Sequence, residues 1–97
     1  MAFAYLIVDT KLTDPTSYEK YKELAKPIVE NFGGKYLARG GEIYIDQDEL
    51  WSPSRIVIVK FPSMQDAKAF LNSAEYKPIK AIRLSASKAT LTVIEGV

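Results

Sequence analysis

The chain has 97 residues, of which 47% are hydrophobic and 26% are charged, and its formal net charge is +1. These are ordinary values for a globular protein and exclude a disordered chain, and the length leaves room for one domain over residues 1–97. A charge so near zero provides no field to attract nucleic acid or anionic lipid, so we expect neither as a partner.

The sequence contains no cysteine and no histidine. This excludes disulfides and thiol nucleophiles, and it removes the side chains that most often bind zinc or act as general base. We therefore expect no metal and no cofactor. Residues 2–8 are apolar, but they lack the basic start of a signal peptide, and no apolar run approaches the ~20 residues that span a bilayer. A cytoplasmic location is expected.

The first half of the chain predicts a strand, a helix and a second strand. Residues 3–10 are rich in β-branched and aromatic side chains and predict a strand. Asp14 and Pro15 are typical of a helix start, and Gly33 with Gly34 ends that helix. Within it, Pro27 predicts a kink or break near residues 23–26.

Residues 35–46 predict the second strand, and Gly40 with Gly41 indicates a bulge or a close backbone approach within it. A polar connection over residues 46–54 contains Trp51, the only tryptophan. It leads to the clearest strand of the chain, residues 55–61.

The last third predicts two short helices and a strand. Ser63 and Asp66 resemble a capping box at the start of the first helix, which Asn72 and Ser73 end. Residues 75–84 predict a further short helix with Pro78 in its first turn. Residues 88–95 predict the final strand.

This order is βαββαβ, which predicts an α+β fold of ferredoxin-like topology. Right-handed crossovers place the helices on one face of a four-stranded antiparallel sheet. The other face has no layer of this chain to cover it.

The strands, however, are apolar on both sides. In residues 55–61, Val57, Val59 and Phe61 point one way, while Ile56 and Ile58 point the other. An uncovered apolar sheet face exceeds what soluble monomers usually expose. The simplest cover is the same face of a second copy, so we expect a homodimer in which two sheets pack face to face.

Several segments resemble a known family in their order and spacing: residues 31–41 (NFGGKYLARGG), 53–57 (PSRIV), 60–64 (KFPSM), 72–76 (NSAEY) and 95–96. The chain is similar to the bacterial family of unknown function DUF1330. The resemblance covers nearly the whole chain and implies the dimeric α/β-barrel superfamily. That superfamily includes cofactor-free monooxygenases, muconolactone isomerase-like enzymes, haem-binding proteins, and small-ligand or regulatory domains. Haem-binding relatives commonly use a histidine, which this chain lacks.

The three arginines are candidate ligand-binding residues. Ten of the thirteen cationic residues are lysines, whereas Arg39, Arg55 and Arg83 each lie in or beside a predicted element. An arginine fork suits a carboxylate ligand in a cleft. Partly buried arginines usually have carboxylate partners, so the interpretation we favour from the sequence is internal ion pairing with Glu42, Glu95 or Asp9, which would hold strand ends and the dimer seam.

Aromatic side chains provide further candidates for the wall of a cleft: Tyr18, Tyr21, Trp51 and Tyr76. Tyrosine hydroxyls facing a cleft can bind a ligand oxygen or donate a proton, and the same holds for Tyr36 and Tyr44 on the second predicted strand. An aromatic stripe at helical spacing is more often core, which is the interpretation favoured for Tyr18 and Tyr21. Trp51 could cap a cleft or pack on the partner subunit, and packing is the interpretation we favour.

Glu42 follows the two glycines and is the best-placed carboxylate for proton transfer, although a catalytic role is the weaker alternative. The leading hypothesis is a homodimer whose helix–sheet clefts bind a small anionic or aromatic molecule. Two alternatives stay open. One is a cofactor-independent enzyme of isomerase, dehydratase or monooxygenase type, and the other is a structural or regulatory dimer without a ligand.

Overall fold

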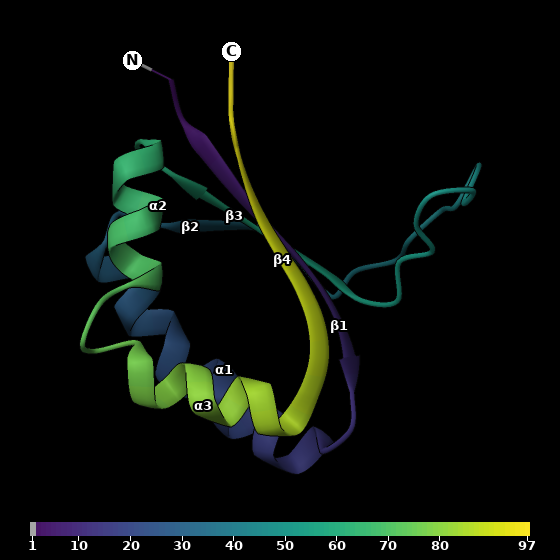
Figure 1. Cartoon of the computed structure of the whole chain (residues 1–97), viewed down its shortest axis with the longest axis horizontal. Coiled ribbons are helices and arrows are strands. Elements are labelled where there is room, and N and C mark those ends of the chain that lie inside the picture. Colours follow the sequence, from purple (N-terminus) through teal and green to yellow (C-terminus); the bar gives the residue numbers. More distant parts are fainter. Residues whose placement is uncertain (1) are drawn as a thin grey trace.

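Four strands and three helices follow one another in a computed structural model that describes residues 2–97 (Figure 1). In chain order they are β1 (Ala4–Leu12), α1 (Pro15–Asn31), β2 (Lys35–Arg39), β3 (Ile56–Phe61), α2 (Met64–Leu71), α3 (Lys77–Ala86) and β4 (Ser87–Glu95). The strands form one antiparallel sheet in the order β2-β3-β1-β4. The helices lie on one side of it (Figure 1). The predicted ferredoxin-like α+β fold is confirmed.

The helix ends follow the predicted caps. The Asp14 carboxylate accepts a hydrogen bond of 3.2 Å from the backbone amide of Ser17, and the Ser63 hydroxyl accepts one of 3.1 Å from Asp66. After α1 the chain reverses at Gly33, whose φ of +83° is left-handed and favours glycine. These local signals fixed where α1 and α2 begin and where α1 ends.

One expectation about local structure holds in part and another is wrong. Helix α1 continues through Pro27, as expected, and it has no break near residues 23–26, where a kink or a break was predicted. The second strand ends at Arg39 instead of Asp46, because Gly40 takes a φ of +70° and leaves the ladder. The irregularity of this strand lies between Tyr36 and Ala38, not at the glycines.

Residues 40–54 connect β2 to β3 without regular structure, and we call them the arm. The arm leaves the end of the sheet and extends away from the rest of the molecule (Figure 1). At the base of the arm, the Gly40 amide donates a hydrogen bond of 2.9 Å to the carbonyl of Ile56, the first residue of β3. Tyr44, expected on a strand, lies on the arm and is 87% exposed.

The two faces of the sheet differ in cover. Leu6 and Val8 of β1, with Val57, Val59 and Phe61 of β3, are buried beneath the helices. We call the opposite side the open face. It is formed by side chains that alternate with the buried ones, mostly apolar with two threonines and the charged Asp9 and Lys60: Tyr5, Ile7, Asp9, Ala38, Ile56, Ile58, Lys60, Thr90, Thr92 and Ile94.

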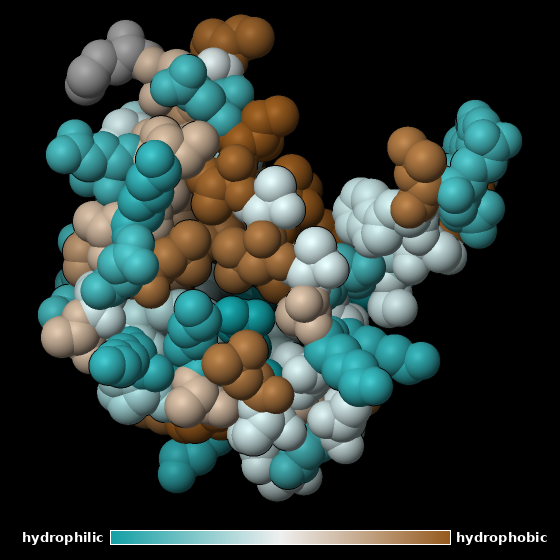
Figure 2. All heavy atoms as spheres, in the orientation of Figure 1, coloured by the Kyte–Doolittle hydropathy of each residue, from teal (hydrophilic) through white to brown (hydrophobic). Residues whose placement is uncertain are grey.

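Hydrophobic atoms gather over the upper part of β4, and the arm stands off from the body across a gap (Figure 2). The alternation predicted for β1 and β3 is confirmed by the strand register. Within residues 2–97, no helix combines the length and the apolar character needed to cross a bilayer.

Candidate functional site

A pocket lies between the sheet and the helices, with walls from α1, α2, α3 and all four strands. Its free volume of about 40 Å³ holds on the order of two or three water molecules. Apolar side chains form much of its lining: Leu6, Val8, Val29, Val57, Val59, Phe70 and Leu91. A site this narrow suits a small ligand, or one charged end of a larger ligand that displaces a wall residue.

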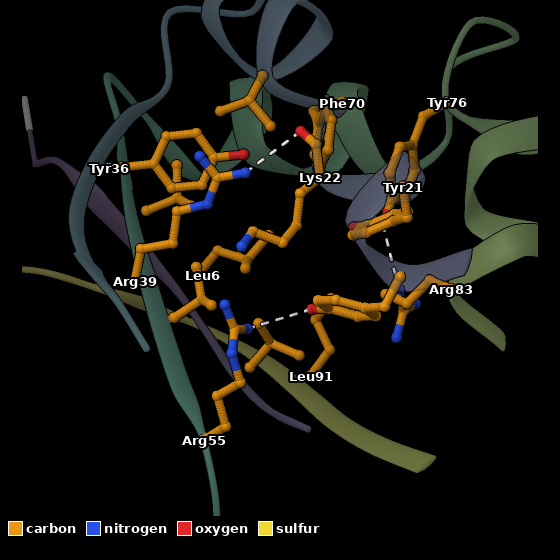
Figure 3. Close-up of a pocket in the computed structure, with 15 residues that line it drawn as sticks. Leu6, Tyr21, Lys22, Tyr36, Arg39, Arg55, Phe70, Tyr76, Arg83 and Leu91 are labelled. Carbon is orange, nitrogen blue, oxygen red and sulfur yellow. Dashed lines mark hydrogen bonds between the residues drawn. The ribbon is translucent and has the colours of Figure 1, made fainter. Parts of the chain in front are cut away.

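Four cationic side chains line this pocket: Lys22, Arg39, Arg55 and Arg83. Lys22 points between Arg39 and Arg55, while Arg83 lies beside Tyr21 and Tyr76 (Figure 3). Among the described residues 2–97, none that lines the pocket is acidic. The lining therefore concentrates positive charge next to apolar surface, an arrangement that favours an anion carrying a nonpolar part.

Arg39 and Arg55 are held by neutral groups. The Arg39 guanidinium lies 4.6 Å from the centre of the Tyr36 ring, and its Nη2 donates a hydrogen bond of 3.2 Å to the Lys22 carbonyl. The Arg55 guanidinium lies 5.3 Å from the centre of the Tyr18 ring, and its Nη1 donates to the Tyr18 hydroxyl at 3.4 Å. Each guanidinium keeps further N–H donors for a ligand.

Arg83 is buried at the other side of the pocket. Its Nε donates a hydrogen bond of 3.3 Å to the Tyr76 hydroxyl, which lies 2.7 Å from the Tyr21 hydroxyl. The Tyr76 hydroxyl is thus bonded to Arg83 on one side and to Tyr21 on the other. The three side chains form a chain of hydrogen bonds from α3 to α1. The chain joins a buried cation to two phenols that line the same pocket.

Burial makes two of the pocket phenols weaker acids. Desolvation raises the pKa of Tyr21 far above its ordinary value, and the neighbouring Tyr76 hydroxyl raises it further. Desolvation also raises the pKa of Tyr36. Both hydroxyls are therefore protonated at neutral pH, so they can donate hydrogen bonds to a ligand but cannot act as bases.

The structure brings together six of the candidate residues named from the sequence: Tyr18, Tyr21, Arg39, Arg55, Tyr76 and Arg83. It does not bring Trp51 or Glu42 to them. Trp51 donates a hydrogen bond of 2.8 Å from Nε1 to Asp9 and borders a groove on the open face. Glu42 is exposed on the arm, and nowhere in residues 2–97 do three His, Cys, Asp or Glu side chains gather as metal ligands would.

The ion pairs expected for the arginines are not formed. Across residues 2–97, the one ion pair joins Lys22 Nζ to Glu19 Oε1 at 3.1 Å. Asp9 instead accepts backbone hydrogen bonds from Ser54 and Arg55, at 2.9 and 3.0 Å. Within one subunit the ion-pair interpretation is therefore wrong, because aromatic rings, hydroxyls and a carbonyl take the place of carboxylates around the guanidinium groups.

Two further residues line the pocket: Lys22, which the sequence analysis does not single out, and Tyr36, which it places on the second strand without favouring it as a ligand-binding residue. Lys22 lies four residues after Tyr18, a spacing that places both on one side of a helix, so it could have been found. Tyr36 and Arg39 are three residues apart and would face opposite sides of a regular strand. The bulge at Leu37 sets both toward the helices, opposite Val59 and Val57. A single sequence gives no sign of that bulge.

The fold and the pocket define a ferredoxin-like α+β protein with one open sheet face and a cationic, tyrosine-lined pocket under its helices. The sequence matches the family "Domain of unknown function (DUF1330)" over residues 3–97, so the chain belongs to this family. Among curated proteins, none matches the sequence.

Solved structures share the fold at low sequence identity. A protein of unknown function from Rhodopseudomonas palustris is 17% identical with a TM-score of 0.77, over 99% of this chain and 83% of that one. SnoaB, a cofactor-independent oxygenase from Streptomyces nogalater, is 10% identical with a TM-score of 0.73, over 100% and 95%. A dimeric ferredoxin-like protein of unknown function from Jannaschia sp. CCS1 is 10% identical with a TM-score of 0.67, over 97% and 99%. At these identities the likeness shows the fold alone.

Proposed function

We propose that this protein is a homodimer that binds a small anionic organic molecule in the pocket under its helices. One observation carries the proposal: four cationic side chains line a pocket that no carboxylate lines within residues 2–97. Lys22 is paired with Glu19, but the three arginines have no carboxylate partner in residues 2–97. Buried or partly buried cations are normally matched by anions, and here the chain supplies the arginines with phenols and a carbonyl instead. A ligand carboxylate or phosphate would meet this need.

Binding can be tested by a thermal-shift survey of small carboxylates and phosphates, followed by calorimetry. Arg39→Met and Arg55→Met each remove a charge and keep much of the side-chain volume. We expect both variants to fold and to bind the compound that stabilises the wild type at least about tenfold more weakly. Lys20→Met, on an exposed position of α1, is the matched control and should bind normally.

The outcome against the proposal is equally definite. If no anion stabilises the wild type, or if the Lys20 control weakens binding as much as the arginine variants, the pocket is not an anion site. The first result would favour the alternative of a structural or regulatory dimer without a ligand.

The homodimer is supported by the apolar open face and by the similarity to structures described as dimeric. Each subunit would contribute residues 1–97 as one domain of a dimeric α/β barrel, with the two open faces in contact. Light scattering should give twice the 10.9 kDa mass of one chain. A well-folded species of single-chain mass at micromolar concentration would contradict this part. A cytoplasmic location stays a prediction.

A cofactor-independent enzyme is the second candidate, favoured by the Arg83–Tyr76–Tyr21 chain of hydrogen bonds. A phenol that stays protonated in the pocket can donate a hydrogen bond to the negative charge that develops on a bound substrate during reaction. Tyr21→Phe would then still bind the compound found by thermal shift but would no longer convert it. Mass spectrometry of the compound measures this turnover. Unchanged turnover in this variant would exclude Tyr21 as the donor.

A further inference from the structure

The arm exposes apolar side chains that its own subunit does not cover. Tyr44 is 87% exposed, Leu50 is fully exposed, and Ile45 and Trp51 are each more than two-fifths exposed. In residues 2–97, hydrogen bonds between arm and body come only from the ends of the arm, through Gly40, Trp51 and Ser54. An irregular connection of this length is uncommon in a small domain, and loops of this kind often carry function.

The charges of the arm and of the rest of the chain are complementary. Residues 40–54 contain no lysine or arginine but include four carboxylates: Glu42, Asp46, Asp48 and Glu49. The arm thus carries a charge of −4 and, since the whole chain carries +1, the remaining residues carry +5. Hydrophilic atoms cover its tip, which is the part farthest from the body (Figure 2). Such an arm is attracted to the cationic body of another molecule of the same chain.

The base of the arm adjoins the open face. Trp51 borders a groove whose other walls are Ile7, Asp9, Thr90 and Thr92, all on that side of the sheet. A second copy seated on the open face is therefore next to the point where the arm leaves the sheet. The arm would continue the same interface, adding its exposed aromatic and aliphatic side chains to it.

We propose that the arm of each subunit docks on the body of a second copy, and that docking orders Arg39 and Arg55. This deepens the homodimer of the proposed function and rests on it. Arg39 immediately precedes the arm and Arg55 immediately follows it. The Gly40 amide is bonded to the Ile56 carbonyl, and a Cβ at Gly40 would lie 3.0 Å from Arg55 Nε. A movement of the arm is thereby passed to both guanidinium groups, so docking of the arm would fix the side of the anion pocket that Arg39 and Arg55 form.

Docking is tested by sedimentation velocity over a range of protein concentrations. Leu50→Asp places a charge on a fully exposed side chain, so the monomer fold is kept, which circular dichroism verifies. We expect its dimer dissociation constant to rise at least about tenfold. Leu84→Asp makes the same change at an exposed position of α3 on the helical side and should dimerise like the wild type. Added salt should weaken the wild-type dimer, because it screens the acidic arm.

Ordering of the arginines is tested without any ligand, by hydrogen exchange of the amides at the base of the arm. In the wild type, exchange at Gly40 and Arg55 should slow as concentration rises through the dimer dissociation constant. In Leu50→Asp, the same amides should exchange fast at concentrations where the wild type is dimeric.

The possible results separate this inference from the proposed function. A wild-type dimer that Leu50→Asp leaves unchanged overturns arm docking and leaves the homodimer standing. Exchange at Gly40 and Arg55 that is independent of concentration overturns the ordering of the arginines. A monomeric wild type overturns both the inference and the proposed dimer. Failure to find a stabilising anion affects only the proposed ligand, because neither sedimentation nor exchange uses one.

Discussion

The hydroxyls of Tyr21 and Tyr76 lie 2.7 Å apart, which joins two helices whose contact residues are 55 positions apart in sequence. Tyr21→Phe removes one of these hydroxyls and should lower the free energy of unfolding by about 1 kcal/mol. Tyr76→Phe also takes the acceptor from the buried Arg83, so it should cost more, about 2 kcal/mol. Urea denaturation measures both. Tyr44→Phe, on the exposed arm, should change nothing, and an equal loss in all three variants would contradict the pairing.

The weak acidity of Tyr21 and Tyr36 predicts a loss of stability in alkali. Burial raises the pKa of both phenols above the ordinary value of 10.0. A raised folded-state pKa stabilises the protein below the unfolded pKa, and this contribution is lost as pH rises above it. Stability should therefore fall from about pH 10 upward, and less steeply in Tyr21→Phe. Tyrosinate absorbance should show that fewer than all six tyrosines titrate before unfolding. Titration of all six in the folded protein would contradict this account.

Asp9 ties the end of the arm to the sheet and predicts an acid transition at its base. Partial desolvation alone would raise the pKa of Asp9, but hydrogen bonds from Arg55, Trp51 and Ser54 outweigh it and lower the pKa. The Asp9 carboxylate therefore stabilises the folded state at pH values above its pKa in the unfolded chain. This stabilisation is lost as pH falls through its lower pKa in the folded state. Since Trp51 is the only tryptophan, its fluorescence reports the change.

Trp51 emission should shift to the red at a pH below the ordinary range of aspartate. Asp9→Ala should show the shifted spectrum already at neutral pH, whereas Asp14→Ala, which removes a helix cap, should keep the native spectrum. A native spectrum in Asp9→Ala would show that the carboxylate does not hold the indole.

The glycine pair at the start of the arm predicts opposite outcomes for two neighbouring substitutions. Gly40 has a φ of +70° and faces the Arg55 guanidinium at 3.0 Å, whereas nothing lies within 4 Å of a Cβ built on Gly41. Gly40→Ala should destabilise the protein by about 1–2 kcal/mol and weaken anion binding by displacing Arg55. Gly41→Ala is the matched control and should leave both unchanged. Urea denaturation and calorimetry measure the two effects, and equal behaviour of the variants would contradict a role for Gly40.

Short-range and periodic sequence patterns predict much of the fold. The caps at Asp14 and Ser63 and the alternation in β3 are short-range patterns, so they could be interpreted from one sequence. The open face followed from the same alternation, because a second apolar side had no helix left to cover it. The grouping of Tyr18, Tyr21 and Tyr76 with the arginines needed only the right topology.

The arm and the bulge could not be predicted in this way. Residues 41–45 contain two isoleucines and a tyrosine, which have high strand propensity, yet they pair with no strand in residues 2–97. Strand β2 ends because Gly40 takes a left-handed conformation. The sequence does not show this, because a glycine within a strand pattern is equally consistent with a bulge. The sequence predicts ion pairs for the arginines because it offers carboxylates, but the actual neighbours of the arginines are set by tertiary packing.

Because of the bulge at Leu37, β2 could lose one residue without changing the face to which its later side chains point. Deleting one residue from a regular strand turns every following side chain to the opposite face. Here β2 carries one residue more than its partner, so deleting Leu37 would leave Ala38 and Arg39 opposite Ile58 and Val57, as they are now. A relative whose sequence lacks residue 37 would therefore still direct the arginine at position 39 into the pocket.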